Sequence, residues 1–346
     1  MATPSFRLLY EQFGHEATFT ALGRPHLLEL LDGNPWFDDT IPFEVHGSRP
    51  EFQQKSIIRR LRQEKFDAMV LFPNSFRSAM IAWLGGARQR IGYGKQGRSF
   101  FLTHFAKIPK QEVPLVDYYL SLADTAVEAI GGRNFSAARN DTSDRHRLEL
   151  HVTPEEEKLG DEIWKTLGLR SPDKVIILNV CSANSLVKYW PIDYAAELSQ
   201  RITRQLDMDI LLNCGPGEID TVNEVAERSK SSRVFSMANL PMNMHTGKIC
   251  IKRARLTVST DSGPLHIALA YGNPAIVLLG PTSETYIANP TVDQTVISRY
   301  LPCSPCHAKR KCPEKHHHCM LEITPDIVFE KVVDILNRRS KEQVFD

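Results

Sequence analysis

The chain has 346 residues, with 42 Lys and Arg against 41 Asp and Glu and a formal net charge of +1. This length exceeds what one hydrophobic core usually serves, so we expect two domains of about 150 to 200 residues. The balanced charge argues against a dedicated nucleic-acid binder, and no apolar run reaches the roughly 18 residues that span a bilayer. The N-terminus has no signal-peptide pattern, so a cytoplasmic protein is expected, with its seven cysteines reduced.

The first half alternates short apolar segments with longer helical patterns, which is typical of βα units around parallel sheets. Thr3-Pro4 predicts a helix start, because Thr is a common N-cap and Pro fits the first helical position. Strands are expected at 16–21, 39–43 and 68–72, and helices near 50–64, 76–84 and 114–130. Residues 133–147 are polar and predict an interdomain linker, so the first domain is expected to cover residues 1–147.

The second half repeats the pattern over an expected domain of residues 148–323. Strands are predicted at 175–178, 209–212, 256–259 and 275–279, and helices after Pro191, from about 218 and over 264–271. Residues 324–346 predict a last helix with one apolar face, which we expect to pack back on the N-terminal domain. The architecture predicted is two doubly wound Rossmann-like α/β domains facing a cleft, with ligands beyond the carboxyl ends of the strands.

The segment from Ser259 to His266 carries the most chemistry, because a buried strand turns into a helix there. Free N–H groups at that helix start favour an anion, and Gly263 would let a phosphate come close. Ser262 can add a hydroxyl donor. Asp261 repels phosphate and is expected to cap the helix or fix the loop instead. The alternative is an ordinary capped βα turn without a ligand.

Residues 261–282, from Asp-Ser-Gly-Pro-Leu-His to Leu-Gly-Pro-Thr, resemble the signature of the ADP-heptose:lipopolysaccharide heptosyltransferase family, glycosyltransferase family 9. Further segments resemble that family and its heptosyltransferase II branch: Lys188-Tyr189-Trp190-Pro191, residues 214–218, residues 72–78 and residues 90–93. The resemblance implies the two-domain GT-B fold. It also implies a first domain that binds the acceptor and a second that binds the nucleotide sugar.

The resemblance implies roles for three more residues of the second domain. Lys188 is expected to neutralise phosphate charge, although it could be a solvated lysine. Glu218 is expected to accept hydrogen bonds from the nucleotide ribose, although an acid in the first turn of a helix is also favoured by the helix dipole. His266 is expected to face the diphosphate, and its alternative is a packed core histidine.

On the acceptor side, Asn74, Arg77 and Arg90 in the family-like segments and Arg98 in the basic stretch around them are candidate acceptor-binding residues. Residues 88–110 hold six Lys and Arg and no Asp or Glu, which suits an anionic glycolipid at a membrane surface. The neighbouring aromatic residues could reach toward lipid or form core, and a solvated basic face is the alternative. We therefore expect peripheral contact with the inner face of the cytoplasmic membrane.

Cys303, Cys306, Cys312 and Cys319 are crowded together among four histidines and could supply a tetrahedral zinc site. Their spacing does not match a common paired zinc ribbon, so reduced thiols that order a loop are the preferred interpretation, and no metal is assigned.

The chain departs from the family at its N-terminus. The family pattern begins with a buried strand and a Gly-Asp loop whose aspartate is the expected general base, and this sequence starts at the helix that follows. A start codon placed too far downstream and a truncated, non-catalytic chain are the two explanations. The first is preferred because every later segment is intact, and no catalytic residue is named.

The function expected is metal-independent, inverting transfer of a heptose or related sugar from ADP-heptose to the inner core of lipopolysaccharide, onto a Kdo-bearing lipid A. No Asp-x-Asp pair is assigned as a metal motif, and no cofactor is expected. The alternatives are a nucleotide-sugar epimerase of the same fold and a non-catalytic module that binds sugar nucleotides or glycolipids. A nucleic-acid partner is not expected.

Overall fold

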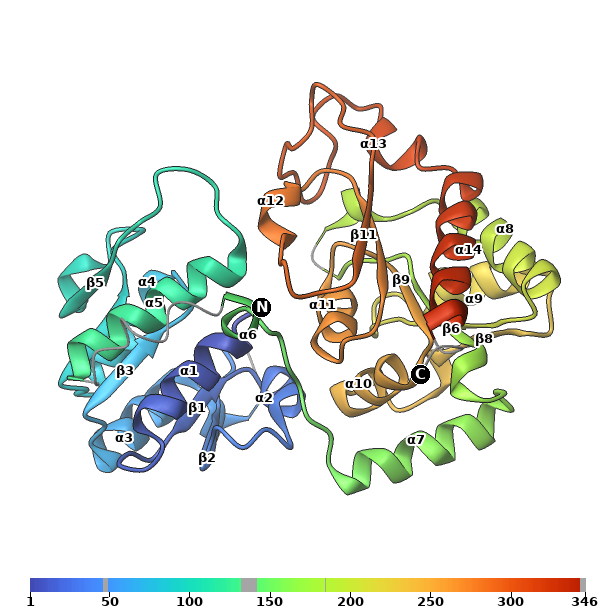
Figure 1. The fold of residues 1–346 in the computed structure, drawn as a ribbon. Coiled ribbons are helices and arrows are strands. Elements are labelled where there is room, and N and C mark those ends of the chain that lie inside the picture. Colours follow the sequence, from blue (N-terminus) through green and yellow to red (C-terminus); the bar gives the residue numbers. More distant parts are fainter. Residues whose placement is uncertain (46–48, 132–141, 184, 343–346) are drawn as a thin grey trace. The chain divides into compact units, whose positions relative to one another are not determined.

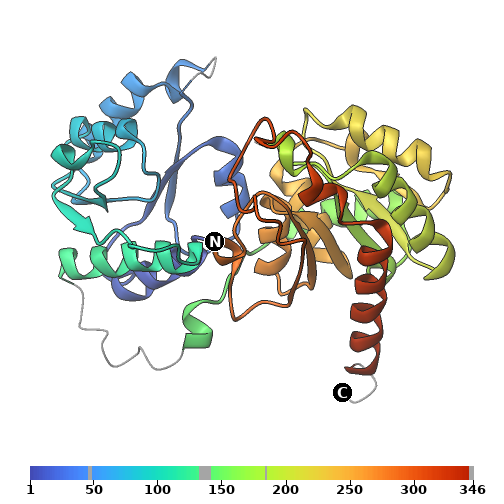
Figure 2. The same cartoon turned by 90° about the horizontal axis from the view of Figure 1, so that it is seen from above.

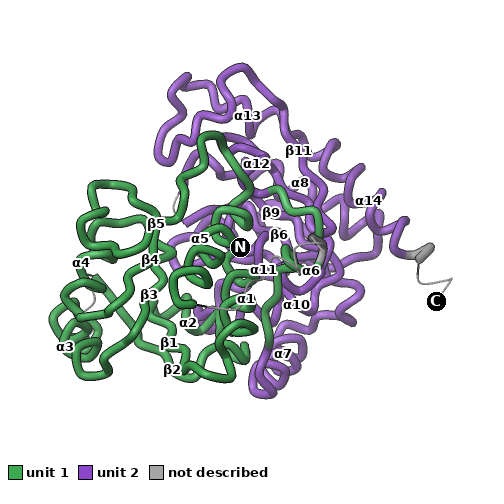
Figure 3. The backbone as a smooth tube through the Cα atoms, turned by 60° about the vertical axis from the view of Figure 1, so that its left-hand side comes forward, with its two compact units in different colours: residues 1–151, 288–291 green, residues 152–287, 292–346 purple. Residues whose placement is uncertain are grey.

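The structure is a computed structural model that describes residues 1–45, 49–131, 142–183 and 185–342. It divides into two compact units, residues 1–151 with 288–291 and residues 152–287 with 292–346 (Figure 3). The unit border lies four residues after the predicted position at 147. Residues 133–141 of the predicted linker lie outside the described residues, and Thr142–Arg145 form the short helix α6.

Unit 1 holds parallel strands in two separate sheets. Its elements are α1 (Thr3–Phe13), β1 (Thr20–Gly23), α2 (Pro25–Leu31), β2 (Asp39–Pro42), α3 (Gln54–Glu64), β3 (Ala68–Leu71), α4 (Phe76–Leu84), β4 (Gln89–Tyr93), β5 (His104–Ala106), α5 (Leu115–Ile130) and α6, with 3-10 turns η1 (Pro50–Phe52) and η2 (Ser99–Phe101). Strand β1 pairs with β2, and β4 lies between β3 and β5 (Figure 3). The sequence analysis did not predict α2, β4 or β5.

The start of α1 differs from the prediction. Ala2 occupies the N-cap position and makes no side-chain cap, so Thr3 is the first helical residue. The Thr3 hydroxyl instead accepts a hydrogen bond of 3.3 Å from the backbone N–H of Glu149. Within residues 1–45 no strand precedes α1, and the absence of a first strand from the domain remains a prediction.

Unit 2 contains one six-stranded parallel sheet among its described residues, in the order β11-β10-β9-β6-β7-β8. Its elements are α7 (Pro154–Leu167), β6 (Val175–Asn179), α8 (Ile192–Gln205), β7 (Asp209–Leu212), α9 (Ile219–Ser229), β8 (Val234–Ser236), α10 (Met244–Arg253), β9 (Leu256–Thr260), α11 (Gly263–Ala270), β10 (Ala275–Leu279), α12 (Glu284–Ile287), β11 (Gln294–Ser298), α13 (His318–Leu321) and α14 (Pro325–Glu342), with 3-10 turns η4 (Pro172–Lys174), η5 (Leu186–Lys188) and η6 (Met237–Asn239). The predicted strands of this half coincide with β6, β7, β9 and β10 to within one residue.

The central strands of this sheet are buried on both faces, as their unbroken apolar runs require. Alternate residues such as Ile176 and Leu178 share one core cluster with side chains of α8, α9 and α14. Helix α10 packs against α7 and α11. The doubly wound arrangement, with α8, α9 and α14 on one face and α10 and α11 on the other, is visible in Figures 1 and 2.

The terminal helix packs within its own unit. Helix α14 packs against α8 and β10 of its own unit, and its apolar face is buried there through Val328, Phe329, Val332 and Ile335. That face is thereby used within unit 2, and packing of the helix on the N-terminal domain stays a prediction. None of the described helices combines the length and the hydropathy needed to cross a bilayer.

Candidate functional site: a polar cluster at the sheet switch point of unit 2

The order in which the chain adds strands to the sheet of unit 2 reverses between β6 and β9, which makes this position a topological switch point. From β6 it continues through β7 to β8 on one side, and then returns to add β9, β10 and β11 on the other side. In open α/β sheets the loops beyond the carboxyl ends of strands at such a switch point form the usual ligand site. Asn179 ends β6, and its register partner Ser259 lies one residue before the end of β9.

Asn179 joins three strand ends through one buried hydrogen-bond network. Its Nδ2 donates to Ser259 Oγ at 3.1 Å, to Ser262 Oγ at 2.9 Å and to the carbonyl of Cys181 at 3.1 Å. Its Oδ1 accepts from Asn213 Nδ2 at 2.9 Å, at the end of β7. This network fixes the loop after β9 relative to β6 and β7.

Asn179 and Asn213 were not among the predicted site residues. A signal was present, because each is a polar residue directly after an apolar run that forms a buried strand. Polar groups at that position are buried only when they are hydrogen-bonded, so they point to an ordered loop. Which partner each would find could not be known from the sequence.

Ser262 and Gly263 form the start of α11. Ser262 is the N-cap residue but makes no side-chain cap, because its hydroxyl is engaged with Asn179 and the carbonyl of Thr260. A Cβ built on Gly263 would meet no heavy atom within 4 Å among the described residues, so packing does not require a glycine there. The amides of the first turn remain uncapped by the Ser262 side chain, which is the arrangement that suits an anion.

Lys188 and Asp261 form an ion pair across 73 residues of sequence. Lys188 Nζ lies 2.7 Å from Asp261 Oδ2 and 2.8 Å from the Asp261 carbonyl oxygen. Of the two roles expected for Asp261, capping of α11 is wrong, because Ser262 holds the cap position. Fixing the loop is the role the structure shows, since the carboxylate ties that loop to η5.

His266 completes this group from the first turn of α11. Its Nε2 lies 3.7 Å from Asp261 Oδ1, and its buried Nδ1 has no hydrogen-bond partner among the described residues. Burial lowers the pKa of His266, and Asp261 only partly opposes this, so the imidazole is neutral near pH 7. Burial alone would raise the pKa of Asp261, but His266 and the Lys188 ammonium outweigh it and hold that pKa far below its usual range.

Glu218 occupies the N-cap position of α9 and is buried. Its Oε2 accepts the backbone N–H of Gly215 at 2.8 Å, whereas its Oε1 is buried with no hydrogen-bond partner in the described part of the chain. Burial, and then the nearby Cys181 and Glu218, raise the pKa of Tyr189 to about 12. A buried carboxylate oxygen without a donor is costly, so this atom is a natural acceptor for a ligand hydroxyl.

The cysteine-rich segment of residues 299–321 supports the turn η5 that carries Lys188. The backbone carbonyl of Val187 accepts a hydrogen bond from His317 Nε2 at 2.6 Å. Ser185 Oγ donates to the carbonyl of Ala308 at 3.4 Å. The same segment is held on the end of β10 by Ser304 Oγ, which donates to the Gly280 carbonyl at 2.6 Å.

The cysteines of that segment are free thiols. Cys303 Sγ lies 3.8 Å from His316 Nε2. Backbone N–H groups, that of His317 foremost, lower the pKa of Cys312, whereas burial raises the pKa of Cys319 to about 11. Within the described ranges no three Cys, His, Asp or Glu side chains are grouped as a metal site would require.

In unit 1 the structure changes the interpretation of Arg98. Its side chain has no exposed surface. Its guanidinium donates to the carbonyl oxygens of Tyr93 and Pro73 and to Asn74 Oδ1, the last at 3.1 Å. Arg98 therefore fixes the segment before α4 through these hydrogen bonds. Its buried guanidinium is not placed to contact an acceptor directly.

The other three acceptor candidates differ from one another. Arg90 donates to the carbonyl oxygens of Phe101 and Ala87 at 2.6 and 2.5 Å, so it also serves as a brace. Asn74 donates to the Tyr118 hydroxyl at 2.8 Å. Arg77 is exposed in the first turn of α4. Of the four, Arg77 is the cation available to a ligand.

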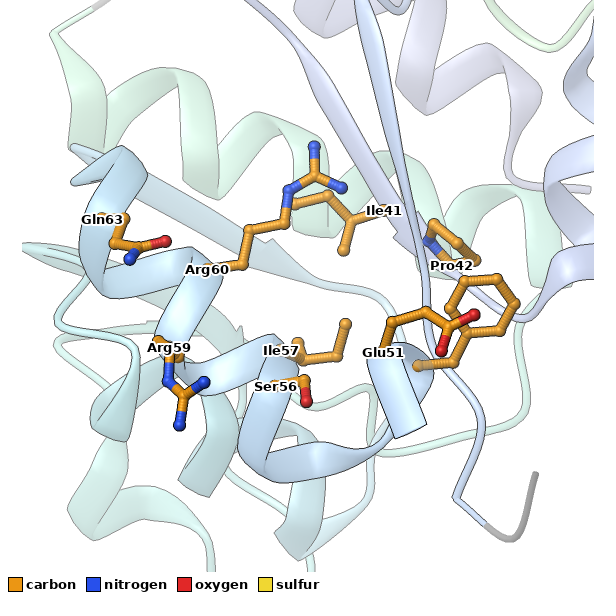
Figure 4. A pocket seen from close by; sticks show the side chains of 9 residues that line it. Ile41, Pro42, Glu51, Ser56, Ile57, Arg59, Arg60 and Gln63 are labelled. Carbon is orange, nitrogen blue, oxygen red and sulfur yellow. The ribbon is translucent and has the colours of Figure 1, made fainter. Parts of the chain in front are cut away.

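A pocket of about 360 Å³ also lies in unit 1, between β2, η1 and α3 (Figure 4). Arg60 on its wall lies 2.6 Å from Asp39 and 2.5 Å from Glu64. The lining residues are Ile41, Pro42, Glu51, Phe52, Ser56, Ile57, Arg59, Arg60 and Gln63. None of them is among the predicted site residues.

Residues 54–318 match the family model for glycosyltransferase family 9 (heptosyltransferase). The chain belongs to this family. The predicted resemblance is thereby confirmed, and the protein is a glycosyltransferase.

Relatives within glycosyltransferase family 9 align over most of their length. Lipopolysaccharide heptosyltransferase 2 of Salmonella typhimurium is 24% identical, with 89% of this chain and 86% of the relative covered. The protein of the same name from Escherichia coli is 23% identical over the same shares of the two chains.

Solved structures show that the fold is shared over nearly the whole chain. E. coli ADP-heptose lps heptosyltransferase II has a TM-score of 0.73 at 20% identity, covering 98% of this chain and 95% of that one. A family 9 glycosyl transferase from Veillonella parvula has a TM-score of 0.79 at 19% identity, covering 97% and 93%. The predicted GT-B class of α/β fold is confirmed by these matches.

Proposed function

We propose that this family 9 glycosyltransferase transfers a heptose, or a closely related sugar, from ADP-heptose to the inner core of lipopolysaccharide. The observation that carries the proposal is the group of Lys188, Asp261, Ser262 and His266 at the start of α11, on the switch point of the sheet. The relatives named lipopolysaccharide heptosyltransferase 2 support the same sugar and acceptor class.

The donor diphosphate binds at the uncapped first turn of α11. A lysine ammonium has three N–H donors. Two of those of Lys188 are directed at Asp261, which leaves one for a phosphate oxygen. Asp261 compensates the ammonium in the free protein, while the helix amides and Gly263 receive the phosphate. This arrangement explains how a carboxylate can stand beside an anion site.

Glu218 supplies the nucleotide contact. A ribose hydroxyl that donates to its Oε1 would satisfy an oxygen that is buried without a donor among the described residues. An ADP group bound in this way would extend from the end of β7 to the end of β9.

The reaction is a direct displacement with inversion. An acceptor hydroxyl oxygen forms a bond to the anomeric carbon, and the bond from that carbon to the phosphate oxygen breaks, so ADP leaves and the hydroxyl proton passes to a base. Lys188 and the α11 amides stabilise the charge that develops on the leaving diphosphate. No residue of this chain is assigned as the base, and no metal ion is needed in this scheme.

The acceptor is an anionic glycolipid of the Kdo–lipid A type, which unit 1 meets at the inner face of the cytoplasmic membrane. Arg77 is the exposed cation of the acceptor segment. Asn74 and Arg98 hold that segment in place, and Arg90 fixes the η2 turn through the Phe101 carbonyl.

Two measurements test the proposal. Calorimetry of the full-length protein should detect saturable binding of ADP and of ADP-sugars. Incubation with ADP-heptose and Kdo-bearing lipid A in EDTA should give a heptosylated product. Loss of turnover in EDTA would contradict the metal-independent scheme. Isomerised donor in the absence of acceptor would identify an epimerase, and binding without turnover would identify a non-catalytic module.

A further inference from the structure

Four aromatic rings meet at the surface of unit 1. Phe101 is central, with ring-centroid distances of 5.1 Å to Phe76, 5.4 Å to Trp83 and 5.6 Å to Phe100. Phe100 is 81% exposed, and Phe76 and Trp83 are each nearly half exposed. Contiguous exposed aromatic surface is unusual on a protein that has no partner for it.

A fifth ring extends this surface. Phe105 on the edge strand β5 is 53% exposed. Its ring lies over Gly94, where an added Cβ would come within 3.3 Å of the Phe105 ring and 2.9 Å of Ser99 Oγ, next to Phe100. We call the five residues Phe76, Trp83, Phe100, Phe101 and Phe105 the aromatic patch.

Hydrogen bonds from the buried Arg98 connect two segments that carry rings of the aromatic patch. Arg98 directly precedes η2, the turn that carries Phe100 and Phe101, and its side chain is buried. Its guanidinium donates to the carbonyl of Pro73 and lies 3.1 Å from Ser78 Oγ, in the segment that begins α4. The turn that carries Phe100 is therefore fixed to the helix that carries Phe76 and Trp83, so the exposed rings are preorganised.

The surroundings of the patch are basic. Residues 68–111 contain no Asp or Glu and seven Lys and Arg, of which Arg77, Arg88, Lys107 and Lys110 are exposed, Arg90 and Lys95 are partly exposed and Arg98 is buried. Arg77 follows Phe76 and is exposed. Lys107 is also exposed, two residues beyond Phe105 and separated from it by the buried Ala106, so the two point to the same side of the chain.

We propose that the aromatic patch is a membrane-binding surface that inserts its rings into the interfacial region of an anionic lipid bilayer. Aromatic rings favour the headgroup level of a bilayer, and basic residues beside them are attracted to anionic lipids. A protein partner with an acidic, apolar face is the competing occupant. The absence of acidic residues from the whole 44-residue segment favours a uniformly anionic surface over a partner that needs paired charges.

This inference deepens the proposed function, because it rests on an acceptor that resides in a membrane. The patch adjoins the acceptor segment, since Phe76 lies between Asn74 and Arg77. Insertion of the rings would therefore hold that segment at the lipid headgroups, where a glycolipid presents its sugars.

Vesicle co-sedimentation of the full chain tests the inference, with phosphatidylcholine vesicles compared with vesicles containing about one-third phosphatidylglycerol. The wild type should bind the anionic vesicles, and more weakly in high salt. The double variant Phe100→Ser/Phe105→Ser should lower the partition coefficient about tenfold. Lys107→Glu should weaken binding to the anionic vesicles and leave binding to phosphatidylcholine unchanged.

Leu27→Ser is the matched control, because Leu27 is 48% exposed on α2, outside the aromatic patch. Equal losses in the control and the double variant, no binding by the wild type, or full binding by the double variant would each overturn the inference. A wild-type dimer that the double variant abolishes in light scattering would also overturn it, as the patch would then be a contact between copies.

ADP calorimetry on the same variants separates this inference from the proposed function. The double variant should bind ADP as the wild type does, since it alters only unit 1 surface residues. Vesicle binding without ADP binding would remove the proposed function and leave the membrane surface standing. ADP binding without vesicle binding would remove the membrane surface and leave the proposed function standing.

Discussion

Lys188 and Asp261 are joined by two contacts, 2.7 Å from Nζ to the carboxylate and 2.8 Å from Nζ to the backbone carbonyl of the same residue. The double contact fixes both the side chain and the main chain of the turn between β9 and α11. The Lys188 ammonium is the only ammonium that we assign to phosphate binding. Its position therefore depends on the position of the α11 start, which we propose as the anion site.

Replacement of Lys188 should weaken donor binding strongly. Lys188→Ala removes the ammonium that faces the phosphate and leaves the Asp261 carboxylate uncompensated beside it, so we expect the ADP dissociation constant to rise about 100-fold. Calorimetry measures this directly. Lys331→Ala on the exposed face of α14 is the control and should bind ADP normally. Unchanged ADP affinity in Lys188→Ala would remove Lys188 from the site.

Gly263→Ala should weaken ADP binding without destabilising the folded protein. An added Cβ would meet no described atom within 4 Å, so the variant should unfold at the same temperature as the wild type. A diphosphate close to the backbone would meet the new methyl group, and we expect ADP affinity to fall at least about tenfold. Gly247→Ala, at a helical glycine with similar space, is the matched control. Equal ADP affinity in both variants would place the ligand elsewhere.

His266 should make stability depend on pH. Its pKa is lowered in the folded protein, so below the unfolded value near 6.5 the unfolded chain binds a proton that the folded chain resists. The stability that neutral His266 contributes is therefore present above that pH and is lost as the pH falls toward the folded pKa, by up to about 1.4 kcal/mol per pH unit. Urea unfolding at pH 7.5, 6.5 and 5.5 measures this against His266→Gln. Parallel pH profiles for the two proteins would contradict it.

His317 should act on the donor site through Lys188 without touching the ligand. Its Nε2 bonds the carbonyl of Val187, next to Lys188, at 2.6 Å. His317 has φ 57°, which Asn tolerates, so His317→Asn keeps the backbone while its shorter side chain loses the bond. We expect ADP affinity to fall about fivefold with little change in kcat. His318→Asn, at an exposed neighbour, should have no effect, and equal behaviour of the two variants would argue against this coupling.

Arg98 should be a stability residue of unit 1. Arg98→Leu removes the donors on which the carbonyls of Tyr93 and Pro73 and the Asn74 side chain depend, so we expect a loss of about 3 kcal/mol or more in unfolding free energy. Arg98→Lys should also destabilise, because an ammonium cannot reproduce the planar fork. Arg88→Ala, at a side chain 84% exposed, should change the unfolding free energy by less than about 0.5 kcal/mol. A stable Arg98→Leu protein would refute the bracing role.

The sequence by itself determined β6, β7, β9 and β10 of unit 2 and the turn at Ser262 and Gly263, whereas β8 and β11 were not predicted. Fully buried parallel strands such as Val175–Asn179 require unbroken apolar runs, and the polar and glycine residues that follow such a run mark the loop at its carboxyl end. These are local signals, so they can be identified without knowing what lies beside them. The family motif added the expected roles of Lys188, Glu218 and His266.

Tertiary structure decided which side chains meet and which way they point. Asn179 reaches Ser262 across 83 residues only because β6 and β9 pair in one register, and Lys188 finds Asp261 for the same reason. A sequence shows that Arg98 is charged but not that its guanidinium turns inward to carbonyl oxygens. Side-chain direction and long-range pairing depend on the packed sheet as a whole, which no local pattern of residues records.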